Sequence, residues 1–252
     1  MEKLVVCNWK MNYGGEDGVS YLLSLLEGLN SLQQRHLWIA APFTVLERLS
    51  RIIKERGSAI TIGAQNVHWE ERGAFTGEVS PIFLKEAGVS FSLIGHSERR
   101  HIFSEDNNLC AKRALGALRA GLKVIFCVGE TLEERECGNH IEVVKRQLSP
   151  LLTEGNLSLL SRDSFLIAYE PVWSIGTGKV PAGQDIEQMH RSISDITSQA
   201  GIKDIMVLYG GSVSPGNIEG LVKLDGVDGF LVGGASLKLE TLIPILEHTC
   251  AE

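Results

Sequence analysis

The sequence predicts an α/β protein that forms one (β/α)8 barrel, and three observations lead to this prediction. Short apolar runs of strand length recur along the 252 residues, and each is followed by a longer amphipathic stretch. The runs are almost continuously apolar instead of alternating, which is typical of parallel strands covered by helices. Eight such units fit the size of a (β/α)8 barrel, which takes about 250 residues.

The apolar runs and the stretches between them define the expected elements. The predicted strands are Leu4–Cys7, Leu37–Ala41, Ala59–Ala64, Phe91–Gly95, Leu122–Val128, Phe165–Glu170, Ile205–Tyr209 and Gly229–Val232. The predicted helices lie near residues 18–31, 44–56, 80–87, 106–120, 131–149, 184–199, 215–223 and 235–248. A doubly wound open sheet is the alternative, but no G-x-G-x-x-G sequence follows the first run. No linker or low-complexity tract divides residues 1–252, so we expect one domain.

Composition and charge narrow the classes of function. The formal net charge of -7 provides no general attraction to nucleic acid or to an anionic membrane. Leu4–Cys7 is too short for a signal peptide and no run has the length of a membrane span, so a cytoplasmic location is expected. The five cysteines are scattered and form no C-x-x-C pair, which predicts neither a disulfide framework nor a metal site.

In a barrel of this kind, the chemically important residues lie where the strands end, on the carboxyl-terminal face. We therefore expect polar and glycine-rich strand ends to meet at one mouth. In chain order these ends are Asn8 and Lys10, His96 and Glu98, Glu170, Gly210–Ser212, and Gly233–Gly234.

Glu170 follows its apolar run directly and precedes a segment with a rigid start and flexible glycines. Pro171 restricts the backbone where the segment begins, whereas Gly176 and Gly178 leave its carboxyl-terminal end free to move. This pattern suggests a base beneath a closing lid, although a solvated Glu beside an ordinary loop has the same local sequence.

The remaining strand ends support the interpretation of Glu170 as a base beneath a lid. A single Gly-Gly pair is most often a tight turn, but two such pairs after the last two strands predict a phosphate site. Lys10 is an anion anchor, a Schiff-base nucleophile or a surface lysine, and its spacing from Asn8 places both side chains on one side of an extended segment. His96 belongs at the mouth. The role of Glu98 stays open.

Two further stretches carry predictions of their own. Arg99, next to Glu98, is expected to form an ion pair with Glu105. The connection from Gln65 to Val79 lacks a periodic pattern and contains Trp69 and Phe75, so it either meets a partner or packs on its own barrel.

The strand-end residues together indicate a class of reaction. A carboxylate and an imidazole facing a phosphate pocket suit proton transfer beside a carbonyl of a small phosphorylated substrate.

At this point the residues resemble the triosephosphate isomerase family. The motifs that carry the resemblance span almost the whole chain and are Asn8-Trp-Lys-Met-Asn12, Gln65-Asn66, Gly73-Ala-Phe-Thr-Gly-Glu78, Ile94-Gly-His-Ser-Glu-Arg-Arg100, Ala168-Tyr-Glu-Pro-Val-Trp173, Ile175-Gly-Thr-Gly178, Tyr209-Gly-Gly-Ser-Val213 and Leu231-Val-Gly-Gly-Ala-Ser236. The resemblance implies a TIM barrel that interconverts dihydroxyacetone phosphate and D-glyceraldehyde 3-phosphate through an enediolate, in glycolysis and gluconeogenesis, without cofactor or metal.

The resemblance also implies a role for each strand-end residue. Glu170 is the base that shuttles the proton, and His96 is a neutral imidazole that acts on the oxygens. Lys10 and Asn8 contact the substrate and stabilise the oxyanion, and Glu98 assists proton handling or positioning. The implied phosphate contacts are Gly176, Ser212, Gly233 and Gly234. The implied lid and its clamp are Pro171, Val172, Trp173, Ser174, Ile175, Gly176, Thr177 and Leu231.

A homodimer is implied as well, with Met11, Phe75 and Thr76 at the interface. Three residues depart from the family pattern: Cys7, Ser174 and Pro181. We interpret Cys7 as a packing residue, and we expect Ser174 and Pro181 to influence the lid. The rival hypotheses are an aldolase that forms a Schiff base on Lys10 and a phosphate-binding barrel without activity.

Overall fold

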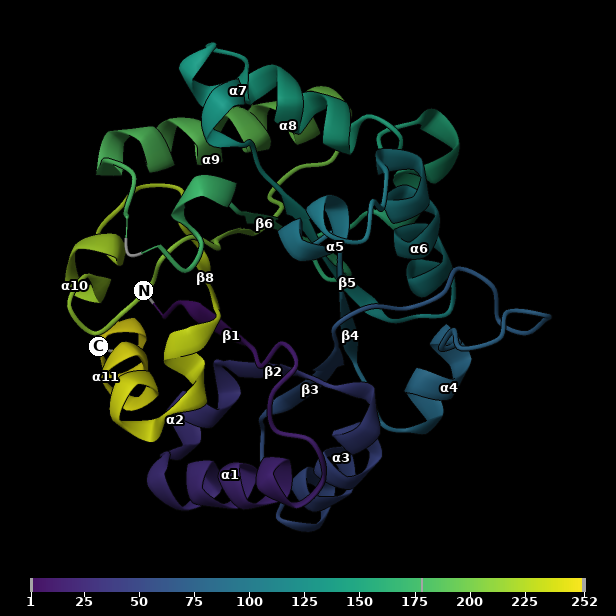
Figure 1. Ribbon diagram of the computed structural model, residues 1–252, viewed down its shortest axis with the longest axis vertical. Coiled ribbons are helices and arrows are strands. Elements are labelled where there is room, and N and C mark those ends of the chain that lie inside the picture. Colours follow the sequence, from purple (N-terminus) through teal and green to yellow (C-terminus); the bar gives the residue numbers. More distant parts are fainter. Residues whose placement is uncertain (1, 178, 251–252) are drawn as a thin grey trace.

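The computed structural model describes residues 2–177 and 179–250, and its eight parallel strands close into a barrel. Closure comes from pairing of the last strand with the first, in which Leu4 lies opposite Gly229 and Cys7 opposite Val232. Figure 1 shows the helices forming a ring around these strands. The strands are β1 (Leu4–Asn8), β2 (Leu37–Ala41), β3 (Thr61–Ala64), β4 (Phe91–Ile94), β5 (Lys123–Val128), β6 (Phe165–Tyr169), β7 (Val207–Tyr209) and β8 (Gly229–Val232). The predicted fold class is confirmed, and every predicted strand lies within two residues of an observed one.

The helical segments follow the predicted order but are more divided. The α-helices are α1 (Gly15–Gly28), α2 (Ser31–Arg35), α3 (Leu46–Glu55), α4 (Pro81–Glu86), α5 (Ser97–His101), α6 (Asn107–Arg119), α7 (Leu132–Glu136), α8 (His140–Leu148), α9 (Gly183–Gln199), α10 (Ile218–Leu221) and α11 (Leu239–Thr249). The 3-10 turns are η1 (Phe43–Val45), η2 (Glu154–Leu159), η3 (Val172–Ser174) and η4 (Gly234–Leu237).

Four helix predictions were wrong in their bounds. The stretch 131–149 is two helices, because Gly138 takes a left-handed φ of 74° that ends α7. The stretch 18–31 divides into α1 and α2, 215–223 keeps only four α-helical residues, and 235–248 begins with η4. Helix α5 was not predicted at all. Its sequence is polar, and it is nucleated by the side chain of His96, which caps its first turn.

The barrel interior is filled by side chains from alternate strand positions. Val6, Phe91, Ile125, Leu166 and Leu208, which come from five different strands, belong to one buried cluster. Gly63 on β3 leaves room for the Phe91 ring, which a Cβ atom at that position would overlap. The interior is therefore a packed core, and any ligand site must lie at its ends.

The intervening strand positions face the helices. Cys7 alternates with Val6 and is fully buried in this outer core. Burial raises the pKa of the Cys7 thiol to about 12, so the group stays protonated and unreactive near neutral pH. The interpretation of Cys7 as a packing residue is confirmed.

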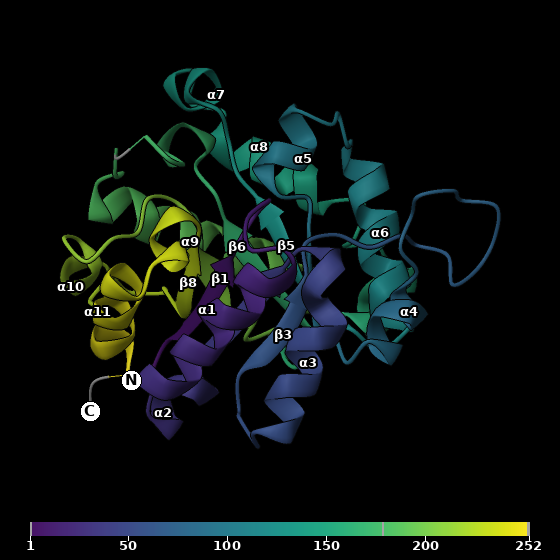
Figure 2. The same ribbon diagram turned by 60° about the horizontal axis from the view of Figure 1, so that its bottom comes forward.

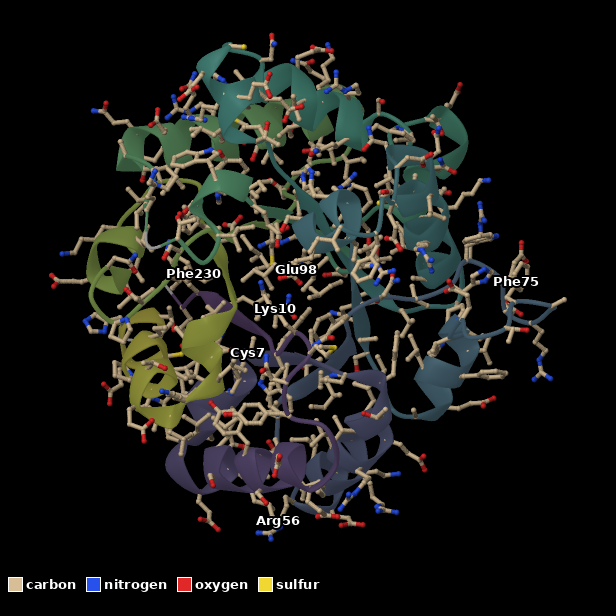
Figure 3. The ribbon with its side chains drawn as sticks, in the orientation of Figure 1. Cys7, Lys10, Arg56, Phe75, Glu98 and Phe230 are labelled. Carbon is tan, nitrogen blue, oxygen red and sulfur yellow. The ribbon has the colours of Figure 1, made fainter. Side chains whose placement is uncertain are left out.

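The connection between β3 and α4 projects from the barrel, as Figure 2 shows. Trp69 is half-buried, and its backbone lies against Gly116 of α6, where a Cβ atom would collide with it. Phe75 lies further out, is 39% exposed and is labelled on this projection in Figure 3. Trp69 thus packs on its own barrel, whereas Phe75 is left partly uncovered.

Within the described residues, no helix combines the length and apolarity needed to cross a membrane.

Candidate active site

A cavity of about 210 Å³ lies at the carboxyl-terminal ends of the strands. It is lined by Asn8, Lys10, His96, Glu170, Ile175, Gly176, Gly210, Gly211, Ser212, Val213, Leu231, Gly233, Gly234 and Ala235. These residues come from both ends of the sequence and meet because closure of the barrel brings β1 next to β8. The strand ends singled out in the sequence, apart from Glu98, therefore share one cavity.

Glu170 and His96 form the centre of this cavity. Glu170 Oε1 lies 3.3 Å from His96 Nε2, and the two residues are only 2% and 6% exposed. The second carboxylate oxygen, Oε2, accepts a hydrogen bond of 3.0 Å from the Ser97 N–H. The base candidate is thus held on one oxygen by the backbone of α5, while its other oxygen faces the imidazole.

The cap of α5 fixes the protonation pattern of His96. Its Nδ1 atom accepts a hydrogen bond of 3.2 Å from the Glu98 N–H, and an acceptor nitrogen carries no proton. The proton of a neutral ring must then lie on Nε2, the atom that faces Glu170 and the cavity. The geometry therefore suits a neutral imidazole that donates from Nε2 to a substrate oxygen.

Lys10 is held in place from several sides. Its Nζ atom lies 2.5 Å from Glu98 Oε1, its N–H donates to Asn8 Oδ1 at 3.0 Å, and its carbonyl accepts from Gln65 Nε2 at 2.7 Å. Figure 3 shows Lys10 and Glu98 together near the centre of the molecule. Asn8 and Lys10 both line the cavity, but the reason given from spacing was wrong: Lys10 has a φ of 49°, so the segment is left-handed there and not extended.

Glu98 lies on the far side of Lys10 and lines a neighbouring cavity. Besides its pairing with Lys10, its Oε2 atom is 3.7 Å from His96 Nδ1, the nitrogen that already accepts the Glu98 N–H. Glu98 thus pairs with Lys10 and does not line the main cavity. The ion pair expected for Arg99 is confirmed, since its Nη2 atom lies 2.6 Å from Glu105 Oε1.

The glycine turns after β7 and β8 line the cavity. Gly210 packs against Glu170 so tightly that a Cβ atom there would lie 2.9 Å from Glu170 Cγ. Gly233 lies beside Lys10, whose Cε atom would be 3.4 Å from a Cβ atom at that position. The Ser212 N–H is different, because it donates to Ser174 Oγ at 3.2 Å. The Ser212 N–H can therefore bind an anion only after its hydrogen bond to Ser174 Oγ breaks.

The segment after Glu170 forms η3 and then borders the cavity with the residues that follow it. Ser174 is fully buried at its base, where the hydroxyl donates to Lys179 O at 2.6 Å. Thr177 Oγ1 donates to the carbonyls of Trp173 and Ser174 at 3.1 and 3.2 Å. Ile175 and Gly176 line the cavity, as does Leu231 from β8. Gly176 has a left-handed φ of 68°, whereas Gly178 lies outside the described residues.

Sequence reasoning missed Glu130, which lies under this segment. It is fully buried, and its Oε1 atom accepts from Tyr169 OH at 3.0 Å and from Trp173 Nε1 at 3.2 Å. Burial, and next the charge of Glu130, raise the pKa of Tyr169 well above its usual value, so the hydroxyl remains a donor. Glu130 follows the end of β5, so the strand-end rule applied to the fifth strand would have found it.

The residues expected at a subunit interface are exposed. Met11 is 97% exposed and Phe75 is 39% exposed, and the two lie on different parts of the molecule, since Phe75 is far from Lys10 in Figure 3. Ile102 and Phe103, for which no interface role was predicted, are also 69% and 62% exposed. Thr76 is also exposed at the tip of the projecting connection. A single chain thus leaves these side chains uncovered on two separate regions.

Together the closed barrel and the carboxylate, imidazole and ammonium groups at its mouth define a (β/α)8 barrel enzyme of the acid–base type. Among the described residues, no three His, Cys, Asp or Glu side chains are grouped so as to hold a metal ion.

Comparisons with known proteins specify the family. A family model described as triosephosphate isomerase matches residues 3–249. A triosephosphate isomerase of Treponema denticola is 42% identical over 245 residues, which cover 96% of each chain. One of Herpetosiphon aurantiacus is 42% identical over 250 residues, covering 96% of this chain and 97% of that protein. The crystal structure of triosephosphate isomerase from Bartonella henselae superimposes with a TM-score of 0.84 at 36% identity, covering 98% of this chain and 99% of that one. The chain belongs to the triosephosphate isomerase family.

Proposed function

We propose that this protein interconverts dihydroxyacetone phosphate and D-glyceraldehyde 3-phosphate, as an aldose–ketose isomerase of glycolysis and gluconeogenesis. The observation that carries the proposal is the buried pair of Glu170 and His96, 3.3 Å apart in a cavity bordered by glycine turns. Family membership supports the same reaction.

The contacts support a separate role for each of these residues in the proton transfer. Glu170 removes a proton from one carbon of the substrate and returns it to the neighbouring carbon, which leaves the carboxylate unchanged after each turnover. His96 Nε2–H donates to the two substrate oxygens in turn while the enediolate carries the negative charge. Lys10 and Asn8 stabilise that charge, and Glu98 keeps the Lys10 ammonium group in place.

The phosphate group of the substrate fits the other half of the cavity. We infer that N–H groups of Gly176, Ser212, Gly233 and Gly234 bind it, since all four residues line the cavity. The segment from Pro171 and Val172 through Thr177 acts as the lid, with Ile175 and Leu231 closing over Glu170. A closed lid is needed because an enediolate phosphate exposed to water loses its phosphate.

The aldolase alternative requires a neutral Lys10 amine. In the structure Lys10 Nζ lies 2.5 Å from a carboxylate oxygen of Glu98, a contact that suits an ammonium ion and not a nucleophile. Borohydride treatment in the presence of dihydroxyacetone phosphate is therefore expected to leave no covalent adduct on Lys10.

We further propose that the chain acts as one domain in a cytoplasmic homodimer. The exposed apolar side chains of Met11, Ile102, Phe103 and Phe75 support burial against a second copy. In that assembly Thr76 of one subunit reaches the Asn8–Lys10 region of the partner subunit. Analytical ultracentrifugation tests this directly, and a monomer at micromolar concentration would contradict it.

One assay tests the catalytic proposal. Purified protein is incubated with dihydroxyacetone phosphate without added metal or cofactor, and formation of glyceraldehyde 3-phosphate is followed. We expect turnover by the wild-type protein and none by Glu170→Gln, because the amide accepts no proton. A folded protein without turnover would refute the isomerase proposal and favour a phosphate-binding barrel.

A further inference from the structure

The carbonyls of Gly233 and of the turn η4, which follows β8, accept hydrogen bonds from hydroxyl groups. Ser236 Oγ donates to Gly233 O at 2.7 Å, and Thr241 Oγ1 of α11 donates to Ala235 O at 2.7 Å. Tyr21 of α1 donates to Ser236 O at 2.7 Å, and Tyr13 donates to Leu237 O. The carbonyls of this turn are thus bonded to Tyr13, to α1 and to α11.

The two tyrosines form a rigid unit with Trp9. The rings of Tyr13 and Tyr21 stack with centroids 4.6 Å apart and an interplanar angle of 15°, and Trp9 meets both edge-on at 5.4 and 5.6 Å. Burial is the main cause that raises the pKa of Tyr21 above its usual value, so its hydroxyl stays protonated and remains a donor. Packed aromatic rings allow little rotamer freedom, so the hydroxyl positions are well defined.

The hydrogen bonds connect Tyr21 to the cavity in three steps. Tyr21 holds the carbonyl of Ser236, and the Ser236 N–H and hydroxyl both donate to Gly233 O, at 2.8 and 2.7 Å. Gly233 O and the Gly234 N–H belong to one planar trans peptide, so they point in opposite directions. Fixing the carbonyl therefore fixes the direction of the N–H of Gly234, a residue that lines the cavity.

Tyr13 connects the same turn to the segment that carries Lys10. Tyr13 lies three residues after Lys10 and has a left-handed φ of 55°, which turns its ring toward Leu237. Lys10 itself runs alongside Gly233. Figure 1 shows α1 and α11 next to each other below this region, and Gly28 of α1 lies close to Ile243 of α11. The aromatic unit thus joins the segment of Lys10 to the turn.

We propose that Tyr13 and Tyr21 are positioning residues that orient the Gly233–Gly234 turn for the substrate phosphate. The inference rests on the proposed function, because it takes the phosphate to bind at this turn. Neither tyrosine touches the substrate. Their hydroxyls act through Ser236 and Leu237, so their loss weakens phosphate binding more than proton transfer.

The test uses Tyr13→Phe, Tyr21→Phe and the double variant, which keep the aromatic stack and remove only the hydroxyls. Inorganic phosphate serves as the probe, and its competitive inhibition constant is measured together with KM and kcat. Loss of one such hydrogen bond corresponds to about a threefold to tenfold effect. We expect each single variant to raise the phosphate inhibition constant and KM by about this factor, the double variant by more, and kcat to change less than twofold.

Thr197→Val is the matched control, because it removes a buried hydroxyl of α9 that bonds to carbonyls of its own helix. It is expected to lower Tm without changing phosphate inhibition. Wild-type constants in all three tyrosine variants would overturn the inference and leave the isomerase assignment intact. Absence of phosphate competition in the wild-type enzyme would instead contradict the phosphate site and, with it, the inference.

Discussion

Gly210→Ala is expected to displace the Glu170 carboxylate without removing any charged or polar group. A Cβ atom at position 210 would lie 2.9 Å from Glu170 Cγ and 3.3 Å from Tyr169 O, with Leu231 Cβ at 3.6 Å. Carbon atoms in contact prefer about 3.5–4.0 Å. The Tyr169 carbonyl is held in the sheet by the Gly210 N–H at 2.8 Å, so the Glu170 side chain must give way.

The size of this displacement determines how much kcat is expected to fall. Relieving the contact requires Glu170 Cγ to move by about 0.7 Å, and a misplacement of about 1 Å can cost about 10²-fold in rate. We expect kcat to fall by about 10- to 100-fold, which is about 1.4–2.7 kcal/mol in activation free energy. The global fold should survive, because the glycine does not take a left-handed φ.

The assay compares kcat of Gly210→Ala and Gly220→Ala in the conversion of dihydroxyacetone phosphate, with circular dichroism and Tm recorded for both. Gly220 is the matched control, because it lies in α10 and a Cβ atom there meets no other part of the described chain within 4 Å. Its replacement should leave kcat unchanged. A folded Gly210→Ala variant with kcat within twofold of wild type would refute the idea that the placement of Glu170 depends on this contact.

Three further predictions address the base, the lid and a buried histidine. Glu170→Asp withdraws the carboxylate by roughly 1 Å and should lower kcat about 10²-fold or more, and a near-normal rate would remove Glu170 from the role of base. Ser174→Ala removes the hydroxyl that joins Lys179 O to the Ser212 N–H, so inorganic phosphate released per turnover should rise by up to about fivefold, and an unchanged ratio would argue against a role in closure. Burial lowers the pKa of His190 from 6.5 to about 4, so between these pH values the unfolded chain binds a proton that the folded chain does not. The free energy of unfolding should therefore fall as pH drops from 6.5 toward 4, by at most about 3 kcal/mol, and the loss should be smaller in His190→Gln when urea unfolding is compared at pH 7 and pH 5.

Local sequence carried much of the fold and of the candidate site. An apolar run of strand length identifies a strand wherever it lies, and the carboxyl end of such a run identifies the mouth of a parallel barrel. For this reason His96, Glu170 and the two glycine turns were found without any tertiary information, and the structure places them around one cavity. Element ends were less well predicted, because caps such as His96 and turns such as Gly138 depend on single residues.

The contacts between distant segments were decided only by the closed barrel. The pairing of Lys10 with Glu98, the Ser212 N–H bonded to Ser174 and the bond of Tyr21 to the carbonyl of Ser236 each join residues that are far apart in sequence. No local pattern encodes such contacts, because they depend on which strand ends are brought together when the eight strands close into a barrel. The sequence by itself thus determined which groups stand at the mouth, whereas the tertiary structure decided which of those groups face the cavity and which only hold the others in place.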